Sequence, residues 1–421
     1  MKIDGQRLLD DLYTLRKITA TPGQGVTRFS YTQEDNRARE YLSHIAEDYG
    51  FSMETDAVGN IRICLQQSKG RIIIGSHIDT VRNGGWLDGV YGVISGLEVL
   101  RTLTDSGIAS DVMLMIYAEE EGSLFGSTMT GSKFLTGKYT ADDLTDLKDD
   151  RGRTLLDHLE ARGYYNADLP LTMDFSSVDR VLEIHIEQGP VMDTEHLQIG
   201  IVDTVFGMHV LEIAFSGLGN HAGASPMVGR RDPMSAFAET ALAVEKIARD
   251  AGNGVVATVG KVSVSPGASN VIPDSVRFTV DVRSNNDRYT TDTVQRIRET
   301  ASKIANTRTV DCTIRDVAAS SAIPLSRTII NEMAALAEDQ KLVYRMMDSG
   351  AVHDTAMLAP FTDAGMIFVP SINGRSHVPE EDTAEADLIR GTQFLMDHIA
   401  RTISQAQGRM RDQSSKIRSK P

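Results

Sequence analysis

The chain reads Ile72-Ile73-Ile74-Gly75-Ser76 and then His77-Ile78-Asp79, so a β-branched run ends directly in residues that can bind a metal ion. A helical pattern follows over residues 90–103, and residues 112–117 form a second apolar run. Alternating strand-like and helix-like segments are typical of parallel sheets covered by helices. We therefore expect an α/β fold with a mostly parallel sheet flanked by helices.

The pattern changes in the middle of the chain. Residues 210–215 alternate in polarity, a helical stretch covers residues 232–250, and residues 255–264 and 276–282 resemble further strands. Two helices over antiparallel strands would suit this segment, which indicates an inserted α+β domain. We expect the following division: a catalytic domain at 1–207 and 324–407, the inserted domain at 208–323, and a disordered tail at 408–421.

Composition restricts the class of protein. The 421 residues include 43 Lys+Arg and 58 Asp+Glu, which gives a formal net charge of -15. Nucleic acid and anionic membranes require clustered basic residues, so neither is an expected partner. At first sight the acidic excess also argues against an anionic substrate.

The compartment is suggested by what the sequence lacks. The two cysteines, Cys64 and Cys312, are too few for a disulfide framework. The sequence shows no signal peptide and no apolar run near the ~20 residues that span a bilayer. These features predict a cytoplasmic protein.

Four predicted strands run directly into residues that can bind metal or transfer protons. Because ligands bind at the carboxyl ends of strands in open α/β sheets, we expect these residues to converge. The segments that follow the strands are His77-Ile78-Asp79, Glu119-Glu120-Glu121-Gly122, His185-Ile186-Glu187-Gln188-Gly189 and Pro370-Ser371-Ile372-Asn373-Gly374-Arg375-Ser376-His377.

Histidine and carboxylate side chains together suit Zn, Mn, Co or Ni, and a carboxylate can bridge two such ions. Asp88 lies in a glycine-rich stretch where turn chemistry alone explains it poorly. The spacing of Asp79 from His77 lets its carboxylate accept the second imidazole N–H. Of the adjacent carboxylates Glu120 and Glu121, one would bind metal and the other would take a proton from water, which is hydrolytic chemistry.

Six motifs together resemble the family of N-carbamoyl-L-amino acid hydrolases, β-ureidopropionases and allantoate amidohydrolases. The resemblance runs from about residue 20 to about residue 400. The motifs are Gly75-Ser76-His77-Ile78-Asp79-Thr80, Asn83-Gly84-Gly85-Trp86-Leu87-Asp88-Gly89, Ala118-Glu119-Glu120-Glu121-Gly122-Ser123, Ile184-His185-Ile186-Glu187-Gln188-Gly189-Pro190, Asn220-His221-Ala222-Gly223-Ala224-Ser225-Pro226-Met227 and Pro370-Ser371-Ile372-Asn373-Gly374-Arg375-Ser376-His377.

The resemblance implies a homodimer with two divalent metal ions per subunit (Zn, Mn, Co or Ni) and a smaller lid and dimerisation domain. The implied metal ligands are His77, Asp88 as the bridge, Glu121, His185 and His377. Glu120 is expected to act as the general base and Asp79 to orient His77. The implied reaction is hydrolysis of a ureido C–N bond by a hydroxide that bridges the metals.

The resemblance also implies residues that hold the substrate. His221 is expected to reach the site, from the partner subunit, and to donate to the developing oxyanion. Asn270 and Arg283 match positions that hold the substrate carboxylate, which suits an Arg fork. The expected lesser contacts are Gln188, His353 and Asn373.

Two departures leave the substrate open. This chain has Gly207-Met208-His209-Val210 where relatives carry an Arg-containing stretch, and Leu124 where they usually have Arg. We expect an N-carbamoyl-L-amino acid, with allantoate, ureidoglycolate and N-carbamoyl-β-alanine as alternatives. An aminoacylase or dipeptidase that cleaves an ordinary amide, and a binding protein with a relic site, are further alternatives. Two bound dications would make the pocket locally positive, so the acidic excess does not exclude an anionic substrate.

Overall fold

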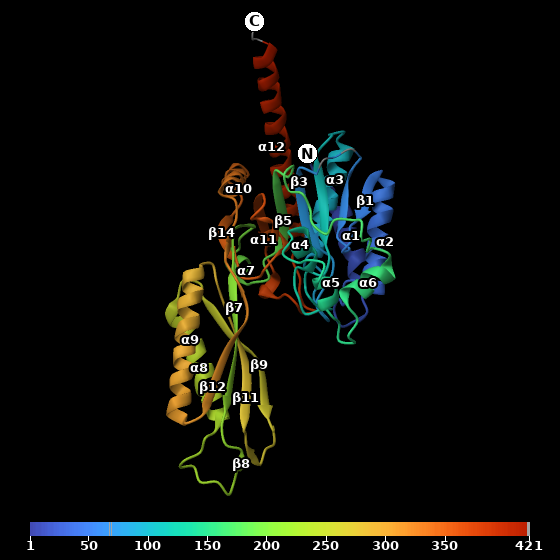
Figure 1. Ribbon diagram of the computed structural model, residues 1–421. Coiled ribbons are helices and arrows are strands. Elements are labelled where there is room, and N and C mark those ends of the chain that lie inside the picture. The colour runs from blue at the N-terminus through green and yellow to red at the C-terminus, as the bar shows by residue number, and fades with distance from the viewer. Residues whose placement is uncertain (67, 69, 419–421) are drawn as a thin grey trace. The chain divides into compact units, whose positions relative to one another are not determined.

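The computed structural model describes residues 1–66, 68 and 70–418, and this part of the chain forms two compact units (Figure 1). The first unit comprises Met1–Asp203, Leu325–Met347 and the chain from His353 onward. The second comprises Thr204–Pro324 and Asp348–Val352. The return of Asp348–Val352 to the second unit was not expected from the sequence.

The larger sheet has a parallel centre and antiparallel edges. Strands β4, β3, β5 and β15 are neighbours and run parallel, whereas β1, β2 and β6 pair antiparallel. The predicted α/β fold with a mostly parallel central sheet is thus confirmed. In sheet order the strands are β1 (Phe51–Thr55), β2 (Ile61–Leu65), β4 (Val112–Tyr117), β3 (Ile72–His77), β5 (Arg180–Ile186), β15 (Asp363–Val369), β6 (Ile199–Val205) and β13 (Ile323–Pro324), and β14 (Tyr344–Ser349) pairs with β6.

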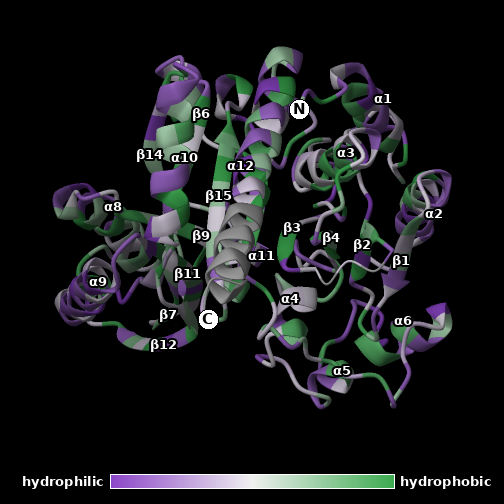
Figure 2. Cartoon of the chain, turned by 90° about the horizontal axis from the view of Figure 1, so that it is seen from above, coloured by the Kyte–Doolittle hydropathy of each residue, from purple (hydrophilic) through white to green (hydrophobic). Residues whose placement is uncertain are grey.

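Helices cover both faces of the central strands. Ile73 packs with Leu358 of α11, whereas the neighbouring Ile74 faces Gly96 of α3. A strand that is buried on both faces needs a continuous apolar run, which explains the sequence of β3. Figure 2 shows the contrast between hydrophobic β3 and hydrophilic α2. The helices of this unit are α1 (Gly5–Arg16), α2 (Gln33–Asp48), α3 (Val90–Asp105), α4 (Thr130–Leu135), α5 (Asp143–Asp146), α6 (Leu155–Arg162), α7 (Val191–Thr194), α10 (Arg327–Asp339), α11 (Asp354–Leu358), the 3-10 helix η1 (Ile372–Gly374) and α12 (Glu385–Arg418).

The last helix extends into the segment that was expected to be disordered. A disordered tail was expected at 408–421, but α12 (Glu385–Arg418) continues through residue 418. The tail prediction was wrong for residues 408–418, since Arg, Met, Gln and Lys are good helix formers and no Pro interrupts them. Residues 419–421 lie outside the described part of the chain.

The second unit is an α+β layer. An antiparallel sheet with the order β12-β7-β11-β9 is covered by α8 and α9, which pack on each other and on the sheet (Figure 1). Its core includes Phe215, Phe278 and Ile297, whose exposed fractions are at most 1%. The elements are β7 (Gly207–Ser216), β8 (Asn220–His221), α8 (Pro233–Ala251), β9 (Val256–Ser265), β10 (Val271–Ile272), β11 (Ser275–Ser284), α9 (Asp287–Arg308) and β12 (Asp311–Ser320).

Over the described ranges, no helix is both long enough and apolar enough to cross a membrane.

Candidate metal centre

Parallel strands bring the predicted residues to one edge of the sheet. His77 is the last residue of β3, His185 lies near the end of β5, and Glu120 and Glu121 follow β4. His377 follows β15 and η1. The convergence that the strand-end pattern predicted is therefore present in the structure.

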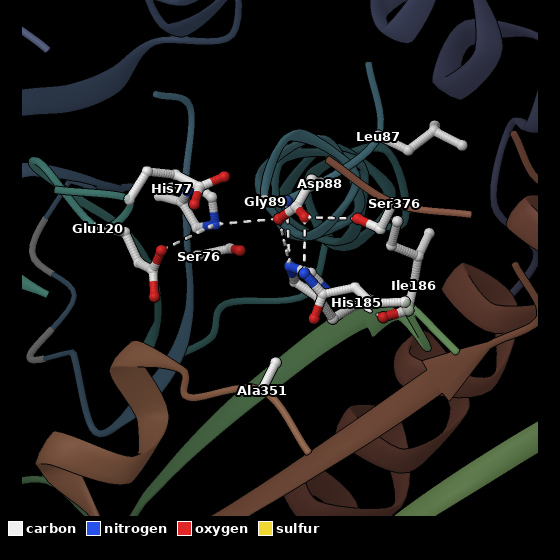
Figure 3. Close-up of polar contacts among 12 residues, drawn as sticks. Ser76, His77, Leu87, Asp88, Gly89, Glu120, His185, Ile186, Ala351 and Ser376 are labelled. Carbon is white, nitrogen blue, oxygen red and sulfur yellow. Dashed lines mark hydrogen bonds and ion pairs between the residues drawn. The ribbon is translucent and has the colours of Figure 1, made fainter. Parts of the chain in front are cut away.

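Asp88 lies at the centre of this cluster, two residues before α3 begins (Figure 3). Its Oδ1 atom is 3.1 Å from Nε2 of His185 and 3.5 Å from Nε2 of His77. Its Oδ2 atom is 3.2 Å from Nε2 of His377, which is itself 3.4 Å from Oε1 of Glu121. Two groups share Asp88, and in each the candidate ligand atoms lie within 4.8 Å of one another: His77, Asp88 and His185, and Asp88, Glu121 and His377.

Backbone carbonyls orient the two buried histidines. Nδ1 of His77 lies 3.0 Å from the carbonyl oxygen of Asp79, and Nδ1 of His185 lies 2.9 Å from that of Ile186. An Nδ1–H that donates to a carbonyl leaves the Nε2 lone pair directed at Asp88, which is the tautomer a metal ligand needs.

The expected contact of the Asp79 carboxylate with His77 is corrected by this geometry. Its Oδ1 atom is 3.7 Å from Nδ1 of His77, which is too long for a hydrogen bond. The carboxylate instead accepts the backbone N–H groups of Glu120 and Glu121, at 3.2 and 3.1 Å. Asp79 thus orients His77 through its backbone and the Glu120–Glu121 loop through its side chain.

Gly89 allows the approach of His77 to Asp88. Its φ of 67° lies in the left-handed region, and a Cβ at this position would lie 2.4 Å from the ring of His77. The N–H of Gly89 also points to Nε2 of His185 at 3.1 Å. Position 89 therefore requires glycine for two reasons, its backbone conformation and the closeness of the His77 ring.

The electrostatics of the cluster favour a cation. Burial alone would raise the pKa of Asp88, but His185, His377 and His77 hold it well below its usual range. The hydrogen bond to Asp88 raises the pKa of His377 to about 9, and burial raises that of Glu121 to about 7. A site that stabilises positive charge on its histidines also suits a divalent ion in place of the protons.

The donor set fits two divalent ions. Among the described residues, Oε1 of Glu121 is a buried carboxylate oxygen with no hydrogen-bond partner. Imidazole nitrogens with carboxylate oxygens, one of them shared, are the ligands that Zn and similar ions accept. His77, Asp88, Glu121, His185 and His377 are thus the residues that could hold such ions.

Glu120 lies close to these residues but belongs to neither of the two ligand groups. Its Oε2 atom is 3.8 Å from Nε2 of His77. Burial, together with the nearby carboxylates of Asp354 and Glu121, raises its pKa well above the usual range. A carboxylate with a raised pKa can accept a proton from water and release it again.

Glu119, the first of the three successive glutamates, has a structural role that was not expected from the sequence. Glu119 is fully buried with a φ of 54°, and its Oε1 atom accepts the N–H groups of Leu124 and Phe125. Its side chain thus closes the loop that carries Glu120. The left-handed backbone, which is uncommon for Glu, could not be read from the sequence.

The lesser substrate positions of the first unit have different surroundings. The Nε2 atom of Gln188 donates to Oδ2 of Asp88 at 2.7 Å, and its buried Oε1 has no hydrogen-bond partner among the described residues. His353 is buried and lies edge-on to His185, with ring centroids 4.8 Å apart. Asn373 is exposed, and its N–H donates to Asp193.

His221 and Asn270 lie together in the second unit. Val271 pairs with His221 in the ladder of β10 and β8, and the N–H of Ala222 donates to the carbonyl of Asn270. Nδ1 of the exposed His221 accepts the N–H groups of Gly223 and Ala224, both at 3.1 Å. The proton of the neutral ring is therefore on Nε2, where it can be donated.

Arg283, also in the second unit, already has an acidic partner. Its guanidinium contacts both carboxylate oxygens of Asp281 on the same strand, at 3.0 and 3.1 Å, and donates to the carbonyl of Gly350. This ion pair was not expected from the sequence, although residues two apart on a strand share a face.

Both departures from the family pattern have local partners. The N–H of Leu124 is held by Glu119, and its side chain packs beside a cluster that includes Phe125. Nε2 of His209 lies 2.5 Å from Oδ1 of Asp316 on the neighbouring strand.

Comparison with known proteins identifies relatives along nearly the whole chain. The model of peptidase family M20/M25/M40 matches residues 73–401. An N-carbamoyl-L-amino-acid amidohydrolase of Paenarthrobacter aurescens is 34% identical over 94% of this chain and 97% of its own length. The allantoate amidohydrolase of Escherichia coli is 32% identical, over 93% of this chain and 96% of its own length. A solved hydantoinase/carbamoylase family amidase from Burkholderia multivorans has a TM-score of 0.86 at 32% identity, and covers 94% of this chain and 97% of its own.

Proposed function

Because the chain belongs to peptidase family M20/M25/M40 and is an amidohydrolase of C–N bonds outside peptides, we propose that it hydrolyses the ureido group of an N-carbamoyl-L-amino acid. The observation that carries the proposal is the pair of ligand groups that share Asp88 beside Glu120. The curated relatives support the ureido chemistry through their names.

The proposed cofactor is a pair of divalent ions, Zn, Mn, Co or Ni, held by the five residues around Asp88. When bound, such ions supply Lewis-acid activation of water and of a carbonyl oxygen. The geometry of Asp88 suits a shared ligand, since its two oxygens face different histidines.

Glu120 is the proposed general base. Its carboxylate takes a proton from the attacking water and returns it to the departing nitrogen, so the same group acts first as base and then as acid. The raised pKa of Glu120 supports the second step, because a stronger base holds the proton until the nitrogen leaves. Nearby, the unpartnered Oε1 of Gln188 could accept an N–H of the ureido group.

His221 is the proposed donor to the oxygen that becomes negative during attack. The two backbone N–H groups at Nδ1 leave a proton on Nε2 for this purpose. In our proposal the protein is a cytoplasmic homodimer in which His221 acts on the partner's site. Size-exclusion chromatography with light scattering tests the dimer.

Arg283 and Asn270 are proposed to hold the substrate carboxylate. The carboxylate would have to compete with Asp281 for the guanidinium or bind its remaining N–H groups. An Asp281→Asn variant should therefore change KM more than kcat.

A substrate panel tests the proposal. The metal-free protein is reconstituted with Mn, Co, Ni or Zn and assayed for ammonia release from N-carbamoyl-L-amino acids, N-carbamoyl-β-alanine, allantoate and ureidoglycolate, with N-acyl amino acids as the contrast. We expect the highest kcat/KM on an N-carbamoyl-L-amino acid. Higher activity on allantoate or ureidoglycolate would move the assignment to those ureido acids, and activity confined to N-acyl amino acids would refute it.

A further inference from the structure

Glu381 joins two segments of the metal centre that are far apart in the sequence. It is 1% exposed, and its Oε1 atom accepts the backbone N–H groups of Leu87 and Asp88 at 2.9 and 3.0 Å. One carboxylate oxygen therefore holds the backbone of the residue that both ligand groups share.

The other oxygen of Glu381 holds the segment that carries His377. Oε2 accepts the hydroxyl of Ser376 at 2.8 Å and the N–H of His377 at 3.3 Å. The Ser376 hydroxyl also lies 3.0 Å from Oδ2 of Asp88 (Figure 3). Glu381, Ser376 and Asp88 thus form a continuous polar chain between the two segments.

The space around Glu381 is closely fitted. A Cβ at Gly85 would lie 1.9 Å from Cδ of Glu381, so a side chain at that position would displace the carboxylate. The backbone of Gly85 has no positive φ, so this glycine is explained by the close approach of Glu381 and not by its conformation.

From these contacts we infer that Glu381 is a positioning residue, which fixes Asp88 relative to His377 and thereby sets the affinity for the ion held by Asp88, Glu121 and His377. The inference rests on the proposed metal centre. Glu381 itself does not contact substrate in this scheme and acts only through the ligands.

Loss of the Glu381 carboxylate would allow the segment that carries His377 to move. The side chain of His377 is 47% exposed and follows a turn, whereas His77 and His185 are fixed in buried strands. The Asp88–Glu121–His377 group therefore depends more on loop contacts than the His77–Asp88–His185 group. Removal of a residue that supports metal ligands typically lowers metal affinity by about 10–100-fold.

The test compares Glu381→Gln with Glu380→Gln in full-length, metal-free protein titrated with Co²⁺. A Gln side chain has the same size as Glu381, but its NH₂ group replaces one of the two carboxylate oxygens. That NH₂ group would face hydrogen-bond donors that the oxygen accepts in the wild type. Glu380 is the matched control, since it is adjacent, 65% exposed and paired with Arg375 at the surface. Absorption of bound Co²⁺ and equilibrium dialysis report affinity and stoichiometry without any substrate, so the result does not depend on which substrate the enzyme uses.

We expect the weaker of the two Co²⁺ affinities to fall by about 10–100-fold in Glu381→Gln and to stay unchanged in Glu380→Gln. Excess Co²⁺ should restore turnover on whichever substrate the panel identifies, with KM unchanged. A wild-type titration curve for Glu381→Gln would overturn the inference. So would low turnover with both ions bound, because Glu381 would then act by another route.

Gly85→Ala provides a second variant, which keeps residue Glu381 unchanged but displaces its carboxylate. It should weaken the same Co²⁺ site, and circular dichroism of the metal-free variants checks their fold. If Glu381→Gln does not fold, Gly85→Ala decides: unchanged Co²⁺ binding would overturn the inference.

Discussion

The Oδ1 atom of Asp88 lies 3.1 Å from Nε2 of His185, and the proton of that imidazole is placed on the other nitrogen by the carbonyl of Ile186. The lone pair on Nε2 accepts the N–H of Gly89 at 3.1 Å. A positive charge between this lone pair and the carboxylate would attract both, and either a proton or a metal ion can supply it. The neighbouring carboxylates of Glu120 and Glu121 have different predicted roles, because Glu121 would bind such an ion and Glu120 would not.

The two adjacent glutamates should respond differently to the same substitution. Glu120→Gln should keep both metal ions and lose about 10²–10⁴-fold in kcat, because the base is lost while the ligands remain. Glu121→Gln should lose metal, since Oε1 of Glu121 belongs to a ligand group. Metal analysis after dialysis, combined with kcat at saturating metal, separates the roles. Equal loss of metal in both variants would contradict the assignment of Glu120 as base.

The convergence of the metal-centre residues could be predicted from the sequence because it depends on local patterns. The strands are rich in apolar residues, His or Glu lies at or soon after the end of each, and parallel strands end at a common edge. His77 and His185 could therefore be placed at the same edge without knowledge of the sheet order.

Contacts that depend on side-chain or backbone direction could not be predicted. The two-residue spacing of His77 and Asp79 permits a bond to the carboxylate or to the carbonyl, and the structure has the carbonyl. Glu381 meets Asp88 only after the chain has folded, since 293 positions separate the two. The helical extension of α12 was missed because a polar composition was read as disorder, although its Arg, Met, Gln and Lys residues favour helix.

Gly89 should be intolerant of alanine for a reason that Gly107 does not share. Both glycines have a positive φ, 67° and 65°, so Ala is strained at each of them, and the left-handed helical conformation alone costs an Ala about 1–2 kcal/mol. The ψ of -47° at Gly89 lies outside that helical region. A Cβ at Gly89 would also meet the ring of His77, whereas nothing lies within 4 Å at Gly107.

We expect Gly107→Ala to lower the unfolding free energy by about 1–2 kcal/mol while metal content and kcat stay normal. Gly89→Ala should lose metal and most of its activity. Chemical denaturation and metal analysis of the two purified variants check this. A Gly89→Ala protein with normal metal content would show that His77 can move without loss of the site.

His398 should make the protein less stable in mild acid. It lies buried in α12, and burial together with nearby Arg180 lowers its pKa to about 4. An unfolded His titrates near pH 6.5, so between about pH 6.5 and pH 4 the unfolded chain binds a proton that the folded protein does not. Stability is therefore lost as the pH falls through this window, and His398 has no such effect above it.

Between pH 7 and pH 5 the loss due to His398 should be about 2 kcal/mol. His398→Gln should remove this part of the pH dependence, and His44→Gln, at an exposed position of α2, should not. Urea denaturation of both variants and the wild type at the two pH values is the measurement. Parallel pH dependence of wild type and His398→Gln would contradict the prediction.

His221 should affect the chemical step more than substrate binding. If its Nε2–H donates to an oxygen that gains negative charge only during attack, His221→Ala lowers kcat by about 10²–10³-fold and leaves KM within a few-fold. His221→Gln, whose amide can also donate, should recover part of kcat.

The arrangement across subunits is tested by mixing His221→Ala with Arg283→Ala protein. If His221 acts on the partner's site and Arg283 on its own, hybrid dimers contain one site with both residues intact and regain activity, while each variant alone keeps its reduced activity. Mixtures without regained activity, despite subunit exchange verified by mass spectrometry, would mean that His221 and Arg283 do not act from different subunits.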